Sequence, residues 1–197
     1  MIAFNSGYLY AILGAIAFSG KGILIKLSYL YSVDAMTLIM YRMLFSLPFF
    51  LSMAIYAEHR AWKKGHFLKA KDILGIVALG FIGYYFSSYL DFLGLQYISV
   101  SLERLILYLN PTMVLLLGWI LYKRQVSMKR FMAMAVSYSG VLLVFGFELS
   151  SAGPDVLKGS TLVFLSAFTY ACYLVLSERM LKIVDSLRLV GWASTVA

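Results

Sequence analysis

Besides Lys26, five charged side chains lie within or at the ends of long apolar runs, where any chemistry that they perform would take place in apolar surroundings. They are Lys21, Arg42, Asp91, Glu103 and Arg104. A charge at the centre of a bilayer costs about 2.5–3.5 kcal/mol on insertion scales, so charges in such runs tend to pair with one another or to face a wet cavity. Cations and carboxylates gathered around one cavity could bind a small polar solute.

The stretch SVSLERLILYLNP, from Ser99 to Pro111, adds two candidates at greater depth. Pro111 removes the backbone hydrogen bond to the Leu107 carbonyl and can kink the helix. Broken helices mark the binding sites of many secondary transporters. We therefore expect Asn110 and Pro111 to belong to the site, with a purely structural kink as the alternative for Pro111.

The composition is that of a membrane protein. Hydrophobic residues make up 62% of the chain and charged residues 13%, and the mean hydropathy is +0.85, whereas a soluble domain is about half apolar and about a quarter charged. The net charge of +8 comes from short basic groups between apolar runs, as membrane topology requires. No basic face or RNA-binding signature accompanies them, so we expect no nucleic-acid partner.

A helix that crosses the hydrocarbon core needs about 20 apolar residues. On this measure we predict an all-α polytopic helix bundle, with a seventh apolar segment opening near Leu187. The first run has the length of a signal-peptide core, but no Lys or Arg precedes it, so we interpret it as a membrane span. The six predicted spans are Gly7–Leu30, Ala35–Ala57, Ile73–Gly94, Ser101–Tyr122, Phe131–Phe147 and Ser160–Ser177.

The distribution of Lys and Arg predicts the orientation. Twelve lie in the connections after the second, fourth and sixth spans, and one, Lys158, lies in the opposite connections. Because cytoplasmic loops carry the excess of Lys and Arg, the N-terminus is predicted to be cytoplasmic. We expect an integral protein of a bacterial cytoplasmic (inner) membrane, in contact with membrane lipid.

On this topology every charge assigned to the spans lies in the outer half of the membrane. One face of the third span carries small and polar residues at helical spacing, namely Gly80, Tyr84, Ser87 and Asp91. In the first span, Gly14 and Ala17 share a stripe with Lys21, where small residues would permit close helix approach. The predicted substrate-binding residues are Lys21, Arg42, Tyr84, Ser87, Asp91, Glu103, Arg104, Asn110 and Pro111.

Several roles stay open between alternatives. Asp91 could pair with Arg42 or Arg104, or could carry a proton. Glu103 and Arg104 could be an interfacial pair, although adjacent residues do not face each other on a helix, so that each would need another partner. Lys26 is expected to snorkel toward the interface.

The first and sixth spans resemble each other. A shift of 152 residues places Leu13 on Leu165, Ala15 on Ala167 and Leu24 on Leu176. Five spans per repeat is an odd number, so a second copy would cross the membrane in the opposite direction. Inverted repeats of this kind are typical of secondary transporters.

These features together resemble the drug/metabolite transporter superfamily, specifically its EamA-type domain. AFSGKGILIKL (Ala17–Leu27) carries a Lys at the family's recurrent position near the end of helix one, and MYRMLFSLPFF (Met40–Phe50) an Arg early in helix two. The family often has Gly-Glu-Arg after helix four, where this chain has Tyr122, Lys123 and Arg124, so the Glu is missing.

The resemblance implies an inverted-repeat 5+5 transmembrane architecture, of which this chain would hold about six helices. Residues 1–147 would be the first EamA-like repeat with five helices, and residues 148–197 the start of the second. The implied function is secondary transport of a small polar or amphipathic metabolite by alternating access, with proton coupling as an option. A second half or a homodimer would complete the bundle.

Other functions find little support in the sequence. There is no GxxxxGK[ST], HExxH or GxSxG motif, so we expect no ATP-driven step, enzyme activity or cofactor. His59 and His66 lack a Cys or carboxylate partner at ligand spacing, so no metal site is predicted. The alternatives are an incomplete, non-transporting membrane scaffold and, with less support, an intramembrane lipid-modifying enzyme.

Overall fold

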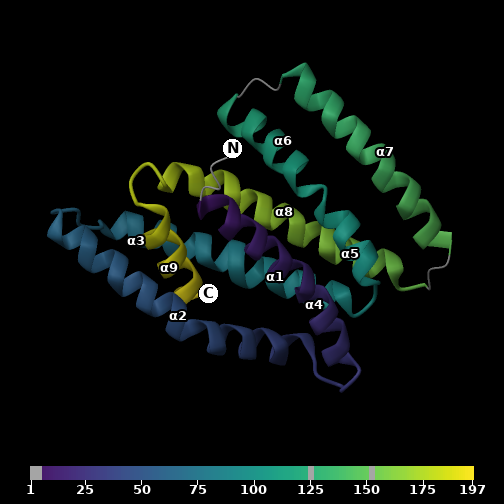
Figure 1. Cartoon of the computed structure of the whole chain (residues 1–197), viewed down its shortest axis with the longest axis horizontal. Helices are drawn as coiled ribbons and strands as arrows, with labels where there is room; N and C mark the ends of the chain where they lie inside the picture. Colours follow the sequence, from purple (N-terminus) through teal and green to yellow (C-terminus); the bar gives the residue numbers. More distant parts are fainter. Residues whose placement is uncertain (1–5, 124–126, 151–153) are drawn as a thin grey trace.

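The computed structural model of the chain describes residues 6–123, 127–150 and 154–197, and every regular element in these ranges is helical (Figure 1). This confirms the predicted all-α fold class. The elements are α1 (Ser6–Tyr29), α2 (Ala35–Lys63), α3 (Ala70–Gly80), the π-helical turn η1 (Phe81–Phe86), α4 (Ser87–Leu95), α5 (Val100–Leu107), α6 (Asn110–Tyr122), α7 (Met128–Ser150), α8 (Val156–Met180) and α9 (Ser186–Val196).

The described residues contain five helical segments that are long and apolar enough to cross a membrane. They are Gly7–Tyr29, Ala35–Lys63, Ala70–Leu95, Val100–Tyr122 and Val156–Met180. These coincide with the first, second, third, fourth and sixth predicted spans. The predicted span at 131–147 forms part of α7, several of whose side chains lie outside the described residues. The seventh apolar segment forms α9.

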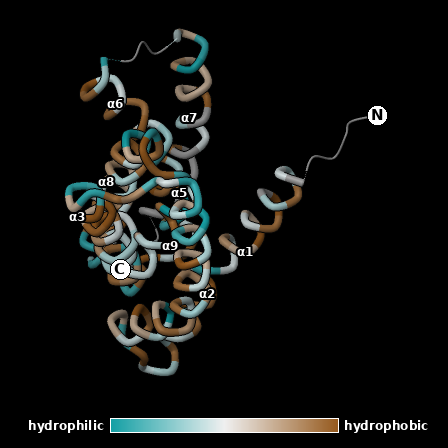
Figure 2. The backbone as a smooth tube through the Cα atoms, turned by 90° about the vertical axis from the view of Figure 1, so that its left-hand side faces the viewer, coloured by the Kyte–Doolittle hydropathy of each residue, from teal (hydrophilic) through white to brown (hydrophobic). Residues whose placement is uncertain are grey.

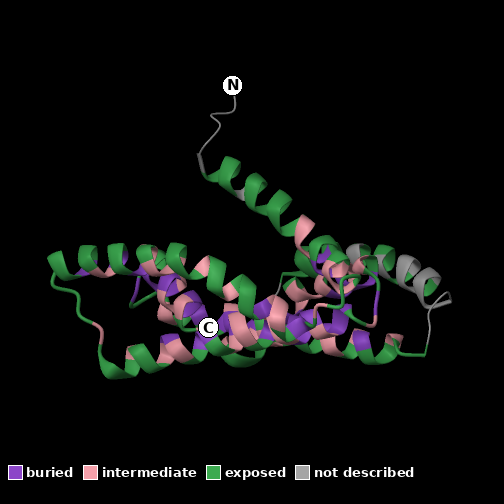
Figure 3. Cartoon of the chain, turned by 90° about the horizontal axis from the view of Figure 1, so that it is seen from below, coloured by how far each residue is buried: buried purple, intermediate pink, exposed green. Residues whose placement is uncertain are grey.

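Helix α8 lies at the centre of the bundle and packs against α3, η1, α4, α5 and α6. Figure 3 shows that the buried residues gather along these central helices. The contact between α4 and α8 is close because two glycines meet there. A Cβ added to Gly94 would lie 2.9 Å from the Gly159 carbonyl oxygen and 2.6 Å from Val163. Gly94 and Gly159 therefore set the distance between these helices.

The π-helical turn η1 interrupts the third span between α3 and α4. Such a turn accommodates an extra residue and rotates the faces of the helix that follows it. Gly80 faces α9, where an added Cβ would lie 2.4 Å from the Ala193 carbonyl oxygen, while Gly83 packs against the Tyr173 ring. Tyr84 packs against the buried cluster that contains both Ala193 and Tyr173, so Gly80 and Tyr84 keep common neighbours although η1 separates α3 from α4.

An ion pair between Glu58 and Arg188 joins α2 and α9, and two Trp side chains donate further hydrogen bonds to the same carboxylate. Arg188 donates from Nε to Glu58 Oε2 at 2.7 Å and from Nη2 to Oε1, while the indole N–H groups of Trp62 and Trp192 donate to the same carboxylate at 3.1 Å. The sequence analysis counted Arg188 among the twelve basic residues of the connections, although the seventh apolar segment was predicted to open near Leu187. Arg188 lies in the first turn of α9, where Asp185 caps the helix by accepting from the Arg188 N–H, and the residue is 3% exposed.

Asp34 starts α2 by a comparable cap in the connection after α1. Its carboxylate accepts hydrogen bonds from the Thr37 hydroxyl and from the backbone N–H groups of Met36 and Thr37. These bonds, first of all the one from the Thr37 side chain, hold the pKa of Asp34 below its usual value. The cap fixes the point at which the chain turns back into the bundle.

The N-terminal half of α1 projects away from the other helices (Figure 2). Tyr10 is 72% exposed and Ile16 64%, and no described atom lies within 4 Å of a Cβ placed on Gly14. The close approach predicted for Gly14 is thus not made by any described residue. Among the described residues, α1 contacts the rest of the bundle from about Ala17 onward, where Ala17 and Phe18 line a pocket.

We expect Gly94→Leu to destabilise the bundle, because its side chain would force α4 away from α8. Overpacking of this kind typically costs about 1–3 kcal/mol. The measurement is the thermal unfolding midpoint of the detergent-solubilised protein. Gly140→Leu is the matched control, since nothing described lies within 4 Å of its Cβ, and should leave the midpoint unchanged. An equal decrease in both variants would contradict the assigned contact.

Candidate substrate-binding site

A cluster of buried charges joins three helices. The Lys21 ammonium on α1 forms an ion pair with Asp91 on α4 and lies 3.7 Å from Glu103 Oε1 on α5. The Arg104 guanidinium Nε lies 3.2 Å from Glu103 Oε2. Asp91 is 3% exposed and Glu103 is fully buried. Because a buried charge is costly unless it is paired, these contacts fix the relative positions of α1, α4 and α5.

Gly22 and Arg104 complete the contact between α1 and α5. A Cβ on Gly22 would lie 3.0 Å from Glu103 Oε2, so the absence of a side chain lets the carboxylate approach the α1 backbone. Arg104 Nη2 donates to the carbonyl oxygens of Phe18 at 3.0 Å and Ser19 at 3.3 Å. A long cation on α5 thus binds both the neighbouring carboxylate and the backbone of α1.

These pairings differ from those that the sequence suggested. Asp91 pairs with Lys21 rather than with Arg42 or Arg104. Glu103 and Arg104 do meet although they are adjacent, because the long Arg104 side chain reaches back to the carboxylate. The Lys26 ammonium donates to the carbonyl oxygens of Leu95 and Ile98, at and just after the end of α4, and its position at the interface stays a prediction.

Beside this cluster lies a pocket of about 400 Å³ between α1, α2, η1, α4 and α8. Of the predicted site residues, Lys21, Arg42, Tyr84, Ser87 and Asp91 line it. The other lining residues are Ala17, Phe18, Gly83, Ser88, Leu107, Ser166 and Tyr170. Two cations and one carboxylate give the lining a net charge of +1. Glu103 and Arg104 do not line the pocket, and Glu103 lies next to the lining residue Lys21.

Arg42 is the cation of the pocket that lacks a carboxylate partner among the described residues. Its Nη1 donates to the Ser88 hydroxyl at 2.8 Å, and the centre of its guanidinium lies 5.7 Å from the Phe92 ring centroid. A guanidinium has five N–H donors in a rigid planar arrangement that suits a carboxylate or phosphate. Arg42 thus has donors left over for an anionic group in the pocket.

Helix α8 contributes two lining residues that the sequence analysis missed. The Ser166 hydroxyl donates to the Ser87 carbonyl oxygen at 2.7 Å, and the Tyr84 and Tyr173 hydroxyls lie 3.1 Å apart. Tyr170 adds an aromatic wall. The resemblance between the first and sixth spans was the one signal in the sequence that could have drawn attention to α8.

The break predicted in the fourth span is confirmed. Helix α5 ends at Leu107 and α6 begins at Asn110, with Pro111 in its first turn, where the missing N–H costs little. The Asn110 side chain donates from Nδ2 to the Ala167 carbonyl oxygen at 3.0 Å and so holds α6 against α8. Asn110 and Pro111 do not line the pocket, and their role in binding stays a prediction.

No group of three or more His, Cys, Asp or Glu side chains that could hold a metal ion occurs in the described part of the chain. His66 contributes its backbone rather than its imidazole, because its carbonyl oxygen accepts from Arg188 Nη1 at 3.3 Å. The residues that line the pocket offer groups for hydrogen bonding, ion pairing and aromatic contact.

Comparison with known proteins identifies the family. Residues 5–146 match the sequence profile described as the EamA-like transporter family, which covers more than two thirds of the chain. The chain belongs to this family, and with it to the drug/metabolite transporter superfamily. No solved structure shows a significant match to it.

Curated relatives from Bacillus subtilis (strain 168) agree with this assignment. The chain is 27% identical over 193 residues to a protein named uncharacterized transporter YcbK, and the match covers 98% of this chain and 61% of that protein. It is 30% identical over 114 residues to uncharacterized transporter YyaM, covering 57% of this chain and 37% of that protein. The chain thus spans less than two thirds of the length of either relative. Their names point to a transporter rather than an enzyme.

We expect Lys21→Met to lower stability, because it leaves Asp91 buried without its cation. Loss of one partner of a buried pair costs about 3–5 kcal/mol. Adding Asp91→Asn should restore part of the loss, since the remaining carboxylate charge is then removed. The measurement is a double-mutant cycle on the thermal unfolding midpoint. Additive effects of the two substitutions would contradict the pairing.

Proposed function

We propose that this chain forms the substrate-binding part of a secondary transporter that moves a small polar or amphipathic metabolite by alternating access. The observation that carries the proposal is the pocket around Arg42, in which charged residues line a cavity of about 400 Å³ within helices apolar enough to cross a membrane. Intramembrane ionisable residues are expensive and typically mark substrate or ion pathways.

The proposed substrate is anionic or zwitterionic. The net charge of the lining is +1, and Arg42 has donors available for a carboxylate or phosphate group. Tyr84, Tyr170 and Phe18 provide aromatic surface for an apolar part of the same molecule. Asp91 and Glu103 are the candidates for proton coupling, because both carboxylates are buried next to Lys21.

The proposed orientation has the N-terminus in the cytoplasm of a bacterial cell and the basic connections on the same side. The orientation is supported by the count of Lys and Arg, since twelve lie in the connections on this side and one lies in the opposite connections. In this orientation Lys21, Arg42 and Asp91 lie in the outer half of the membrane. The Glu58–Arg188 contact between α2 and α9 then lies at the cytoplasmic end and closes the bundle below the pocket.

We further propose that a second half, or a second copy, completes the bundle in the 5+5 arrangement. Residues 1–147 would form one repeat, and residues 148–197 the start of an inverted one. Helices α1 and α8, which resemble each other in sequence, both line the pocket. A binding site between corresponding helices of two repeats is the arrangement typical of inverted-repeat transporters.

We expect Arg42→Ala and Glu103→Gln each to lower transport by tenfold or more in cells that express the full gene product. For Arg42→Ala, loss of a hydrogen bond to a charged group of the substrate costs about 1.5–3 kcal/mol, which is roughly ten- to hundredfold. Glu103→Gln instead removes the buried charge that faces Lys21 and Arg104 and is the candidate for proton coupling. The measurement is flux across a panel of amino acids, nucleosides, organic anions and toxic amines. Arg60→Ala, a substitution of the same type at an exposed position of the same helix, should transport normally.

Membrane insertion of each variant is quantified in parallel, so that loss of flux is not confused with loss of protein. Flux that survives both Arg42→Ala and Glu103→Gln would contradict the assignment of this pocket as the substrate pathway. The search would then move to the helix break at Asn110 and Pro111.

A further inference from the structure

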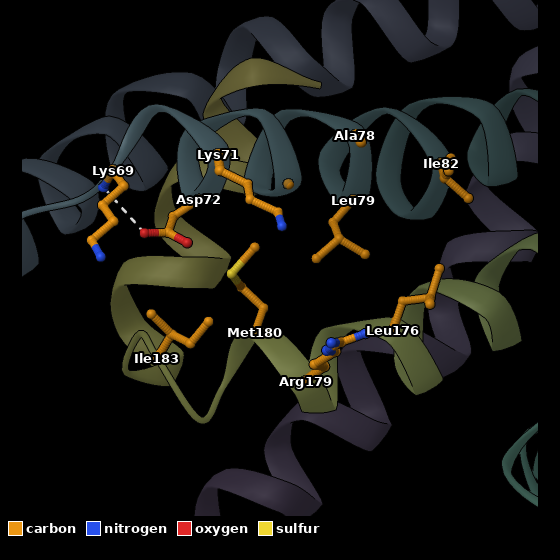
Figure 4. Close-up of a pocket in the computed structure, with 11 residues that line it drawn as sticks. Lys69, Lys71, Asp72, Ala78, Leu79, Ile82, Leu176, Arg179, Met180 and Ile183 are labelled. Atoms are coloured by element: carbon orange, nitrogen blue, oxygen red, sulfur yellow. Dashed lines mark hydrogen bonds between the residues drawn. The ribbon is translucent and has the colours of Figure 1, made fainter. Parts of the chain in front are cut away.

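A groove, separate from the pocket around Arg42, lies between α3 and α8 at the basic end of the bundle (Figure 4). Its volume is about 600 Å³. The apolar side chains of both helices line its walls, and Met180 crosses to α3, where an added Cβ on Gly75 would lie 2.4 Å from the Met180 methyl carbon. The apolar lining residues are Gly75, Ala78, Leu79, Ile82, Leu176, Met180 and Ile183.

The rim of this groove is basic. Lys69 and Lys71 lie at the start of α3 and Arg179 at the end of α8, so that Lys71 and Arg179 stand on opposite walls (Figure 4). All three are exposed, and no ion pair joins any of them to another residue in the described ranges. Asp72, the one acidic lining residue, is engaged by the Lys69 backbone N–H at 3.1 Å.

From this arrangement we infer that the groove between α3 and α8 binds an anionic phospholipid. The phosphate lies between Lys71 and Arg179, and an acyl chain follows the apolar walls toward Ile82. Lys71 and Ile82 are eleven residues apart, which corresponds to about 16 Å along a helix, about half the thickness of the hydrocarbon core. Basic pockets between helices at the cytoplasmic side are known to suit anionic headgroups.

Charge complementarity selects the lipid over other occupants. Three unpaired cations at the mouth favour a negative headgroup over a zwitterionic one, and the apolar walls favour a ligand with a hydrocarbon tail over free phosphate. Exposure of Leu176 at 41% and Ile183 at 63% is costly in water but not against an acyl chain. The proposed lipid binding does not depend on the proposed transport function. The proposed orientation decides only which leaflet of the membrane supplies the lipid.

The test is native mass spectrometry of the purified gene product in detergent, titrated with phosphatidylglycerol or phosphatidylcholine of identical chains. We expect one phosphatidylglycerol to bind more tightly than phosphatidylcholine, with an affinity that falls as ionic strength rises. In the Lys71→Gln/Arg179→Gln variant the affinity should fall by about fivefold for each cation removed. Lys129→Gln/Arg130→Gln, which removes two exposed cations at the start of α7, should bind as the wild type does.

A photo-crosslinking residue in place of Ala78, inside the groove, identifies the occupant in native membranes. Crosslinks to phospholipid support the proposal. Crosslinks to peptides of the same protein or of a second copy would overturn it, because protein would then cover the groove. Equal affinity for both lipids, equal loss of binding in the two double variants, or competition by glycerol phosphate without acyl chains would overturn it as well. None of these readouts involves flux, so their failure is distinct from failure of the transport proposal.

Discussion

The structure depends on how a fully buried carboxylate is compensated between apolar helices. Glu103 is 0% exposed, and an uncompensated charge in such surroundings would not persist. Lys21 and Arg104 approach it from α1 and α5, and Lys21 also binds Asp91 on α4. Gly22 provides the space for this approach. Three helices therefore have one mutual arrangement in which every buried charge faces an opposite one.

This arrangement also creates the pocket. Because Lys21 and Asp91 neutralise each other, Arg42 on α2 is the charge left available for a solute, and Ser88 holds it in place. At the opposite end of the bundle another carboxylate, that of Glu58, is compensated by a different set of donors. There Glu58 accepts four hydrogen bonds from Arg188 and two Trp side chains, which closes α2 on α9. The pocket thus lies between the charge cluster around Glu103 and the contact between Glu58 and Arg188.

The sequence was sufficient to predict five of the spans, the break before Pro111 and the gathering of Lys21, Asp91, Glu103 and Arg104, because these follow from run length, backbone chemistry and the cost of buried charge. It could not predict which charges pair. Partner choice depends on helix rotation, which η1 alters by one residue, and on the reach of long side chains such as Arg104. The contribution of Ser166 was missed because a small hydroxyl residue in an apolar helix carries no distinctive pattern.

The most direct test of a solute-accessible, positively charged pocket is thiol modification of a Ser88→Cys variant in a Cys172→Ser background. Ser88 lines the pocket and accepts from Arg42. Membrane-impermeant thiol reagents that carry a sulfonate or an ammonium group have opposite charges. The account predicts that both react and that the sulfonate reacts faster, with the difference abolished by Arg42→Gln. No modification by either reagent, or faster reaction of the ammonium reagent, would contradict it.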